Sequence, residues 1–419
     1  MMYSTKFFHV YLALLFILAT TSVSSPAVWS NTAQVSSHPN KTKEATGPDM
    51  ALAPFQYELL SLAFDAATSI PLQPHIKTRA RQQQMLVETA LELNQVSLAL
   101  EHAKGIPNWR RRAALADIAA FLAQEGETEK AKALIEQATA PSEGDVEEWR
   151  KDAVSVKVAR ALTILGETQE AADASASLVD VHVGKLELAK AEFGEDETFA
   201  QQVETLDELL ASQNFEIMKN ALNAYTQLYD RYYADVEKRE ELEKKIPAAW
   251  DDMPIIVRLE LVEKLAHFAF QNGDREKAFA FVDQAQGFVD NYNWPEEHQI
   301  QFAADVLKLR AEIGHFDRVR VDGAALLERF QANKGKIVNI YRAESIRPLA
   351  EAYALMGERD RALEVYKIVL AEGRVNPNSR PQAEDFTETA ASIVKFGLEP
   401  DDELWKQLRE MRHGLVAPW

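Results

Sequence analysis

The stretch that decides the fold is residues 113–136, AALADIAAFLAQEGETEKAKALIE. On both sides of Gly126, apolar residues recur at the i, i+3, i+4 and i+7 spacing of a helix that buries one face. Glycine adopts the left-handed backbone conformation that commonly ends a helix without a steric clash. The stretch therefore predicts a hairpin of two helices joined by a tight turn at Gly126.

The same turn recurs along the chain, at Gly126, Gly166, Gly273, Gly314, Gly357 and Gly397. The intervals between these glycines are 40, 107, 41, 43 and 40 residues. We expect the long interval to hide one divergent unit near residues 212–215, and an earlier unit to turn at Leu93-Asn94. Strand patterns are nearly absent after residue 50. The sequence thus predicts an all-α superhelix, a solenoid of about seven stacked helix hairpins.

Small residues stand where paired helices must cross closely. Seven positions before the first five turn glycines, and five positions after them, alanine occupies eight of ten sites. The ten residues are Ala119, Ala159, Ala266, Leu307, Ala350, Ala131, Ala171, Ala278, Val319 and Ala362. Stacked hairpins explain this regularity better than the alanine content of the chain does.

These units resemble tetratricopeptide repeats (TPR). In residues 346–378, IRPLAEAYALMGERDRALEVYKIVLAEGRVNPN, the resemblance rests on Leu349-Ala350, Tyr353, Gly357, Ala362 and Tyr366. Other units match less fully, and Gly323 stands where the family has a bulky residue. The spacing exceeds the 34 residues of the family, so the resemblance implies a TPR-like solenoid of exported bacterial type.

The resemblance also implies a function. First helices of such hairpins line a concave groove that suits a protein or peptide partner. By the family's pattern, the groove candidates are Arg160, Glu260, Glu263, His267, Gln271, Lys308, Glu344, Arg347 and Glu351. We therefore expect a non-enzymatic scaffold for protein–protein interaction in the cell envelope or periplasm.

The chain is expected to divide into five parts. Residues 1–24 are predicted to be a signal peptide and 25–50 a flexible leader. TPR-like hairpins are expected in 51–183 and in 247–419, the latter ending in a cap. Between them, residues 184–246 are expected to form a divergent helical insert with one long Tyr-rich helix, from Phe215 to Lys245.

The N-terminus has the pattern of a secretory signal. Lys6 precedes an apolar run from Phe7 to Ala19, and small residues follow, with a cut expected near Ser24. The run is shorter than the ~20 residues that span a membrane, although an uncleaved anchor remains an alternative. We expect a periplasmic or secreted protein without stable membrane insertion after cleavage.

Composition and motifs exclude several functions. The chain has 46 Lys and Arg against 65 Asp and Glu, a net charge of −19, which repels nucleic acid. Cysteine is absent, which excludes a lipoprotein anchor, disulfides and thiolate metal sites. The HExxH, GxGxxG, GxxxxGK[ST] and GxSxG motifs are missing too. We expect no metal, no cofactor and no enzymatic activity, and the sequence leaves the oligomeric state open.

Carboxylate pairs leave an alternative open. Pairs such as Glu296-Glu297 and Asp401-Asp402 stand at predicted helix starts, where the helix dipole favours negative charge. A glycosidase needs two carboxyl groups that face each other across a cleft. A helical-body enzyme with an unrecognised carboxylate site is therefore the alternative to a scaffold.

The Tyr-rich helix suggests a second alternative. Tyr225, Tyr229, Tyr232 and Tyr233 follow helical spacing and predict a packing stripe. Four tyrosines within nine residues exceed what packing needs, so we expect some of these rings to reach solvent. Exposed rings would form a partner groove or a carbohydrate-binding module for cell-wall glycans.

One basic block interrupts the acidic sequence. It consists of Trp109, Arg110, Arg111 and Arg112, at a predicted helix start after Pro107. A salt-bridged helix surface is the simpler interpretation. The alternative is a secondary patch that binds an acidic segment of a partner.

Overall fold

The structure, a computed structural model, describes residues 51–140, 148–176, 178, 180–194, 198–251, 253–416 and 419, with backbone only for 148 and 180–184. Residues 37–419 form one compact unit, and everything below concerns this unit by itself. The predicted signal peptide and flexible leader lie outside the described residues.

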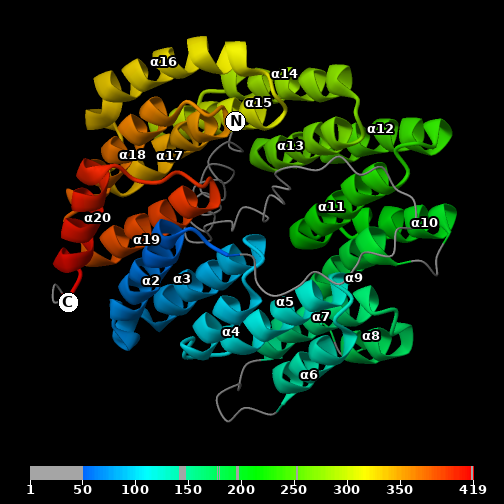
Figure 1. Cartoon of the computed structure of the whole chain (residues 1–419). Coiled ribbons are helices and arrows are strands. Elements are labelled where there is room, and N and C mark those ends of the chain that lie inside the picture. The colour runs from blue at the N-terminus through cyan, green and yellow to red at the C-terminus, as the bar shows by residue number, and fades with distance from the viewer. Residues whose placement is uncertain are drawn as a thin grey trace, which may run out of the picture. The chain divides into compact units, whose positions relative to one another are not determined.

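All regular structure in the described residues is helical, which confirms the predicted all-α class (Figure 1). The helices are α2 (Pro54–Ser69), α3 (Leu72–Glu92), α4 (Val96–Lys104), α5 (Arg110–Gln124), α6 (Thr128–Thr139), α7 (Glu148–Ile164), α8 (Thr168–Ser175), α9 (Asp180–Phe193), α10 (Phe199–Leu210), α11 (Phe215–Arg231), α12 (Val236–Trp250), α13 (Ile255–Gln271), α14 (Arg275–Asn291), α15 (Glu296–Glu312), α16 (Phe316–Asn333), α17 (Asn339–Leu355), α18 (Arg359–Arg374), α19 (Ser379–Lys395) and α20 (Asp402–Gly414). A 3-10 turn, η1 (Lys334–Lys336), follows α16.

The helices from α3 to α20 pair as consecutive hairpins. All six predicted turn glycines have positive φ, between 62° and 83°, and Asn94 at the predicted early turn has φ 61°. All ten predicted crossing positions are buried. The turn pattern and the small-residue pattern thus both predicted the hairpins correctly.

The interval between Gly166 and Gly273 departs from expectation. It holds two hairpins, α9–α10 and α11–α12, so the described residues contain nine hairpins where about seven were expected. Gln213, near the predicted divergent turn, has φ 56° and joins α10 to α11 between hairpins.

The predicted long helix from Phe215 to Lys245 is wrong. The chain turns between α11 and α12, and Asp235 caps α12 by accepting a hydrogen bond from the backbone nitrogen of Lys238 at 3.3 Å. This aspartate cap replaces the glycine that marks other turns. Pro247 does not end α12, which continues to Trp250. The predicted boundaries at 183/184 and 246/247 consequently lie inside α9 and α12, and the supposed insert consists of ordinary hairpins of the array.

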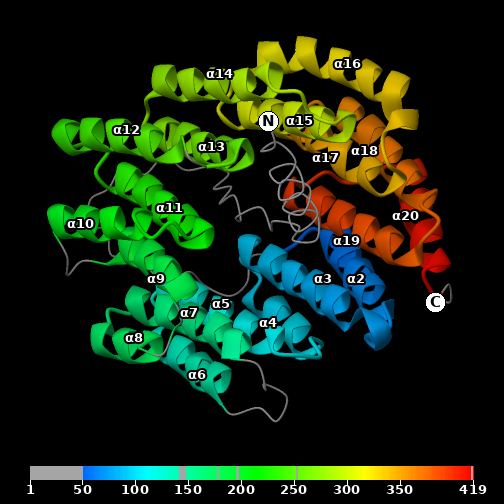
Figure 2. The same cartoon turned by 180° about the vertical axis from the view of Figure 1, so that it is seen from behind.

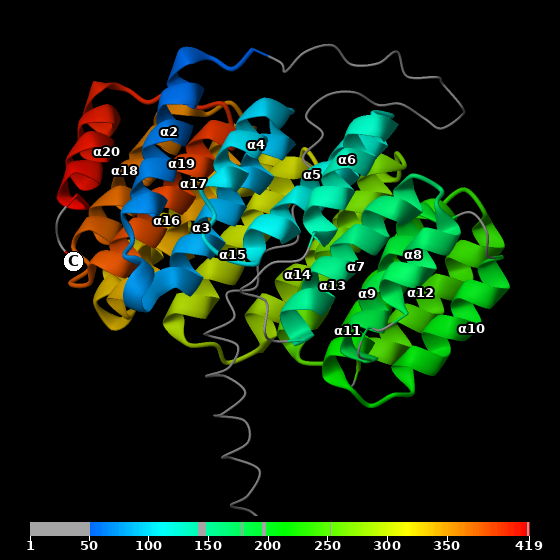
Figure 3. The ribbon, with the colours of Figure 1, turned by 90° about the horizontal axis from the view of Figure 1, so that it is seen from below.

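The odd-numbered helices from α3 to α19 lie side by side, and we call them the inner helices (Figures 1 and 2). The even-numbered helices from α4 to α20 cover them on the outer side. Figure 3 shows the hairpins edge-on, stacked beside one another. Each hairpin therefore buries its apolar residues against the next one, as in a repeat solenoid.

The two ends of the array pack against each other. Helix α19 contacts α2 and α3, and Gln56 of α2 donates a hydrogen bond to the carbonyl of Val394 at 3.0 Å. Ion pairs join Arg409 to Glu58 at 2.9 Å and Lys395 to Glu92 at 2.7 Å. The solenoid of this unit is thus closed into a circuit.

Closure overturns the predicted C-terminal cap. Helix α19 is buried on most of its sides because α2 and α3 cover the face that a cap would leave to solvent. The apolar core reflects this, since one buried cluster combines residues between 59 and 171 with residues between 300 and 415. A second cluster covers residues 191–313.

Candidate functional site

Polar side chains bridge successive inner helices. They form a series that we call the inner ladder. Its rungs are Arg110–Gln84 (2.8 Å), Lys157–Asp117 (2.6 Å), Arg160–Glu192 (3.5 Å), Lys219–Glu260 (2.8 Å), Lys264–Asn223 (2.6 Å), His267–Glu312 (2.9 Å), Lys308–Glu351 (2.7 Å), Arg347–Glu388 (2.9 Å) and Arg81–Glu384 (2.7 Å). Several partners are 40 to 43 residues apart, so they occupy equivalent positions in neighbouring repeats.

Glu351 is the most constrained member of the inner ladder. It is 8% exposed, pairs with Lys308 of α15, and accepts a hydrogen bond from Ser392 of α19 at 2.7 Å. Burial alone would raise the pKa of Glu351, but Lys308, Arg347 and the Ser392 hydroxyl outweigh it and hold the pKa below its ordinary value. This carboxylate stays ionised and ties three inner helices together.

The inner ladder also crosses the closure. Glu388 of α19 pairs with Arg347 of α17 and accepts a hydrogen bond from the Gln82 amide nitrogen of α3 at 3.1 Å. Arg81 of α3 pairs with Glu384 one turn away. Side chains from opposite ends of the sequence therefore belong to one polar network.

Three carboxyl groups in this region have no hydrogen bond or ion pair within the described part of the chain. They are Glu263 of α13, Asp305 of α15 and Glu344 of α17. Burial, assisted by neighbouring carboxylates such as Glu351, raises the pKa of Asp305 to about 7. Burial and like charges also raise the pKa of Glu263 and of Glu344. These groups are therefore reluctant to carry a negative charge without a cation.

All nine predicted groove residues lie on inner helices. Arg160, Glu260, His267, Lys308, Arg347 and Glu351 take part in the inner ladder, whereas Gln271 is exposed at the end of α13. Glu263 and Glu344 are the two that have no bonded partner.

The prediction missed half of the inner ladder. The missed residues include Arg81, Gln82, Gln84, Asn223, Asp305, Glu312 and Glu388. The repeat period itself is the pattern that could have found several of them, since a shift of about 41 residues leads from one rung partner to the other.

The tyrosines do not form an exposed groove. Tyr225 and Tyr229 are fully buried and Tyr233 is 5% exposed, so no ring face of these three is open to a sugar. Their hydroxyl groups bond to Asp207 (2.6 Å), Glu243 (3.3 Å) and Asp274 (2.9 Å), respectively. The rings fill the space between neighbouring hairpins, which is why packing uses more of them than expected. Tyr232 alone is partly exposed, with Lys238 over its ring at 4.5 Å.

The basic block does not form one patch either. Trp109 stands edge-on to Trp149 at 5.5 Å between ring centroids. Arg110 donates to Gln84 on an inner helix, while Arg112 donates to the carbonyl of Ala138 at 2.6 Å. Arg111 is exposed. Because the arginines have separate partners, the block fits the simpler interpretation of a bonded helix start.

The carboxylate pairs described by the structure stand at helix starts, as predicted. Glu296 and Glu297 occupy the first turn of α15. Asp401 caps α20 by accepting a hydrogen bond from the backbone nitrogen of Leu404 at 2.9 Å, and Asp402 follows in the first turn. These pairs stabilise helix ends.

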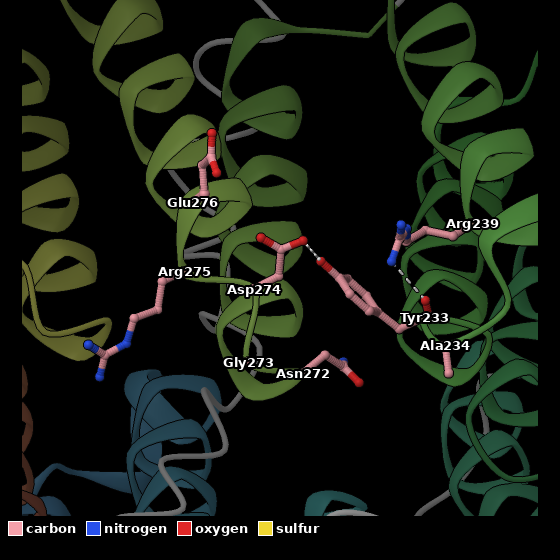
Figure 4. Close-up of a pocket in the computed structure, with 8 residues that line it drawn as sticks. All are labelled: Tyr233, Ala234, Arg239, Asn272, Gly273, Asp274, Arg275 and Glu276. Carbon is pink, nitrogen blue, oxygen red and sulfur yellow. Dashed lines mark hydrogen bonds between the residues drawn. The ribbon is translucent and has the colours of Figure 1, made fainter.

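A cavity of about 590 Å³ lies between the α11–α12 and α13–α14 turns (Figure 4). Its polar groups already bond to one another, as Tyr233 donates to Asp274 and Arg239 donates to the Tyr233 carbonyl at 3.1 Å. It is lined by Tyr233, Ala234, Arg239, Asn272, Gly273, Asp274, Arg275 and Glu276. This cavity is a gap between two hairpin turns whose hydrogen bonds are satisfied internally.

No protein-family model matches the chain, and no curated protein matches it. One similar solved structure is described as "Circular tandem repeat protein with novel repeat topology and enhanced subunit contact surfaces". It is 16% identical, with 86% of this chain and 94% of that chain covered and a TM-score of 0.26. Among the described residues, no helix is long and apolar enough to cross a membrane, and no group of His, Asp and Glu is arranged to hold a metal ion.

Proposed function

We propose that this protein is a non-enzymatic, TPR-like scaffold whose inner helices bind a protein or peptide segment. The observation that carries the proposal is the inner ladder, which presents polar side chains at equivalent positions of successive repeats. A segment laid across the inner helices would meet a regular series of donors and acceptors. Stacked repeats hold that series rigidly, so little conformational freedom is lost on binding.

The rungs can serve a ligand as well as the fold. Lys308, Arg160 and Lys219 keep 20% to 28% of their side chains exposed although each is ion-paired. A side chain in this state can add a hydrogen bond to a passing peptide without first breaking its own. The buried part of each rung sets the position of the exposed part.

We also propose that the protein is exported to the periplasm or secreted, on the pattern of residues 1–24 and the absence of cysteine. The test is N-terminal sequencing of the protein recovered from the soluble envelope fraction. A mature N-terminus near residue 25 is expected. Recovery only from membranes, with residues 1–24 intact, would contradict export by a cleaved signal.

Photo-crosslinking tests the scaffold proposal. A photoreactive amino acid replaces Gln271, at the exposed end of inner helix α13, and in a matched variant it replaces Arg318 on outer helix α16. With envelope extract, we expect discrete protein adducts from position 271 and none of the same size from position 318. Equal adducts from both positions, or none from inner positions, would refute binding on the inner helices.

A helical enzyme is the second candidate. One observation favours it, because Glu263 and Asp305 on neighbouring inner helices hold protons near neutral pH, as a general acid does. This candidate requires that the full chain release sugar from cell-wall glycan. It also requires that Glu263→Gln and Asp305→Asn each abolish that release while leaving the fold intact.

A further inference from the structure

One sector of the inner helices carries excess negative charge. It consists of the ladder-side residues of α13, α15, α17 and α19, and we call it the acidic sector. Its carboxyl groups are Glu260, Glu263, Asp305, Glu312, Glu344, Glu351, Glu384 and Glu388. Against these eight stand the cations Lys264, Lys308 and Arg347, His267, and the neighbouring Lys219 and Arg81. Cations of the chain do not balance this sector.

The imbalance falls on Glu263, Asp305 and Glu344. They occupy three successive inner helices, 42 and 39 residues apart in the sequence, which is one repeat each time. The carboxyl group nearest in charge to Glu263 is Asp305, and Glu344 in turn acts on Asp305. They therefore form a row across the inner helices, with no bonded cation in the described part of the chain.

A buried amide at the end of this row lacks a donor. Gln82 is 2% exposed, and its nitrogen is fixed on Glu388, which is also the first charge neighbour of Glu344. Its amide oxygen is buried and accepts no hydrogen bond within the described residues. Leaving a buried acceptor unsatisfied costs about 1–3 kcal/mol. An incoming N–H donor would remove that cost.

We infer that the segment bound by the inner helices is basic: a lysine- or arginine-rich stretch of peptide whose cations lie along Glu263, Asp305 and Glu344 and beside Gln82. This inference rests on the proposed scaffold function and names its partner class. An extended chain of cations fits because the carboxyl groups are spread over three helices. A single metal ion does not fit, since no three ligands converge in the described residues.

Binding of cations should be linked to protons. Asp305 faces charged groups from its own helix and from both neighbours, namely Lys308, Glu351, Glu344, Arg347 and Glu263. Its pKa of about 7 means that the carboxyl group is largely protonated at pH 6 and largely ionised at pH 8. Because a cation prefers the ionised form, a basic peptide should bind more tightly as pH rises through 7.

The experiment measures anisotropy of fluorescein-labelled octalysine with the full chain, beside labelled octaglutamate and a Gly-Ser octapeptide. We expect octalysine to bind, the other two not to bind, and affinity for octalysine to rise between pH 6 and pH 8. The double variant Asp305→Asn/Glu344→Gln should weaken binding about tenfold or more and flatten the pH dependence.

A matched control removes the same charge elsewhere. Glu136→Gln/Glu328→Gln alters two exposed outer-helix residues, on α6 and α16, and should leave octalysine binding within about twofold. Circular dichroism checks that both double variants are folded. Equal weakening in the two variants means diffuse surface attraction and overturns the inference.

The outcomes separate the two proposals. If a neutral or acidic peptide cross-links to position 271 while octalysine does not bind, the basic partner is refuted and the scaffold function stands. If position 271 captures no protein or peptide, both are refuted. Octalysine that cross-links at position 271 and loses affinity in Asp305→Asn/Glu344→Gln supports both.

Discussion

At the scale of single residues, α15 places two carboxyl groups in opposite situations. Burial and like charges raise the pKa of Asp305 to about 7. A hydrogen bond from Arg329 lowers the pKa of Glu296, at the start of the same helix, below its ordinary value. Protonation therefore stabilises the fold at Asp305, whereas ionisation stabilises it at Glu296.

We predict that Asp305→Asn stabilises the protein more at pH 8 than at pH 4. In the parent, the stability that comes from protonated Asp305 is fully present below the ordinary pKa of 3.8 and is lost as pH rises through about 7. Asparagine cannot ionise, so the variant escapes that loss. Urea unfolding at pH 4, 6 and 8 measures the difference.

Glu296→Gln is the control with the opposite sign. Its pKa is lowered in the fold, so its stability contribution is present above the ordinary value of 4.5 and is lost as pH falls. The variant should lose stability at pH 8 relative to the parent and approach it at low pH. Identical pH profiles for parent and Asp305→Asn would contradict the assigned pKa.

The residue scale also shows how far sequence carried the candidate site. Arg347 was identified from its place in a recognisable repeat, but its partner Glu388 lies in a unit whose turn and Ala390 alone matched the pattern. Pairing depends on which face each helix turns to its neighbour. Sequence periodicity sets that face for one helix, and only packing sets it for two.

At the scale of elements, a glycine in α16 shows why one repeat looked weak. Gly323 stands where the TPR pattern has a bulky residue, and a Cβ at that position would lie 2.7 Å from the Tyr353 hydroxyl. The same Cβ would lie 3.0 Å from Leu349 Cδ1. Tyr353 is 2% exposed and has no room to move aside. The bulky ring of α17 thus occupies the space that a large residue of α16 would fill.

We predict that Gly323→Ala destabilises the protein by about 1–3 kcal/mol, the usual cost of overpacking a core. Gly287→Ala is the matched control, since Gly287 also lies inside an outer helix but its nearest atom would be 3.8 Å from the added Cβ. That control should gain up to about 1 kcal/mol, because alanine favours the helix. Chemical denaturation compares both variants. A neutral Gly323→Ala would mean that α16 and α17 separate easily.

At the scale of the whole unit, closure is the feature with the widest consequences. Gln56, Glu58 and Glu92 near one end bond to Val394, Arg409 and Lys395 near the other. The core that these contacts cover joins residues of both ends. An open solenoid would have two independent ends, whereas this unit should lose both together.

We predict that Glu58→Cys/Arg409→Cys is cross-linked within one chain by a short bis-maleimide reagent. The parent side chains are 2.9 Å apart, and the parent has no cysteine that could react instead. After limited proteolysis, the terminal fragments should remain joined on a reducing gel. The control Glu58→Cys/Arg318→Cys uses α16, which lies apart from α2 in Figures 1 and 2, and should not cross-link. An uncrosslinked first variant would mean an open unit.

The sequence by itself determined the hairpins, because a turn glycine and small residues at fixed offsets are local requirements of two helices that cross. It missed the α11–α12 turn, where an aspartate cap does the work of glycine without interrupting the apolar period. Only the tertiary structure decided that the array closes and that Gln82 meets Glu388 across 306 residues. Closure depends on small rotations summed over nine hairpins in the described residues, and no local pattern of residues records such a sum.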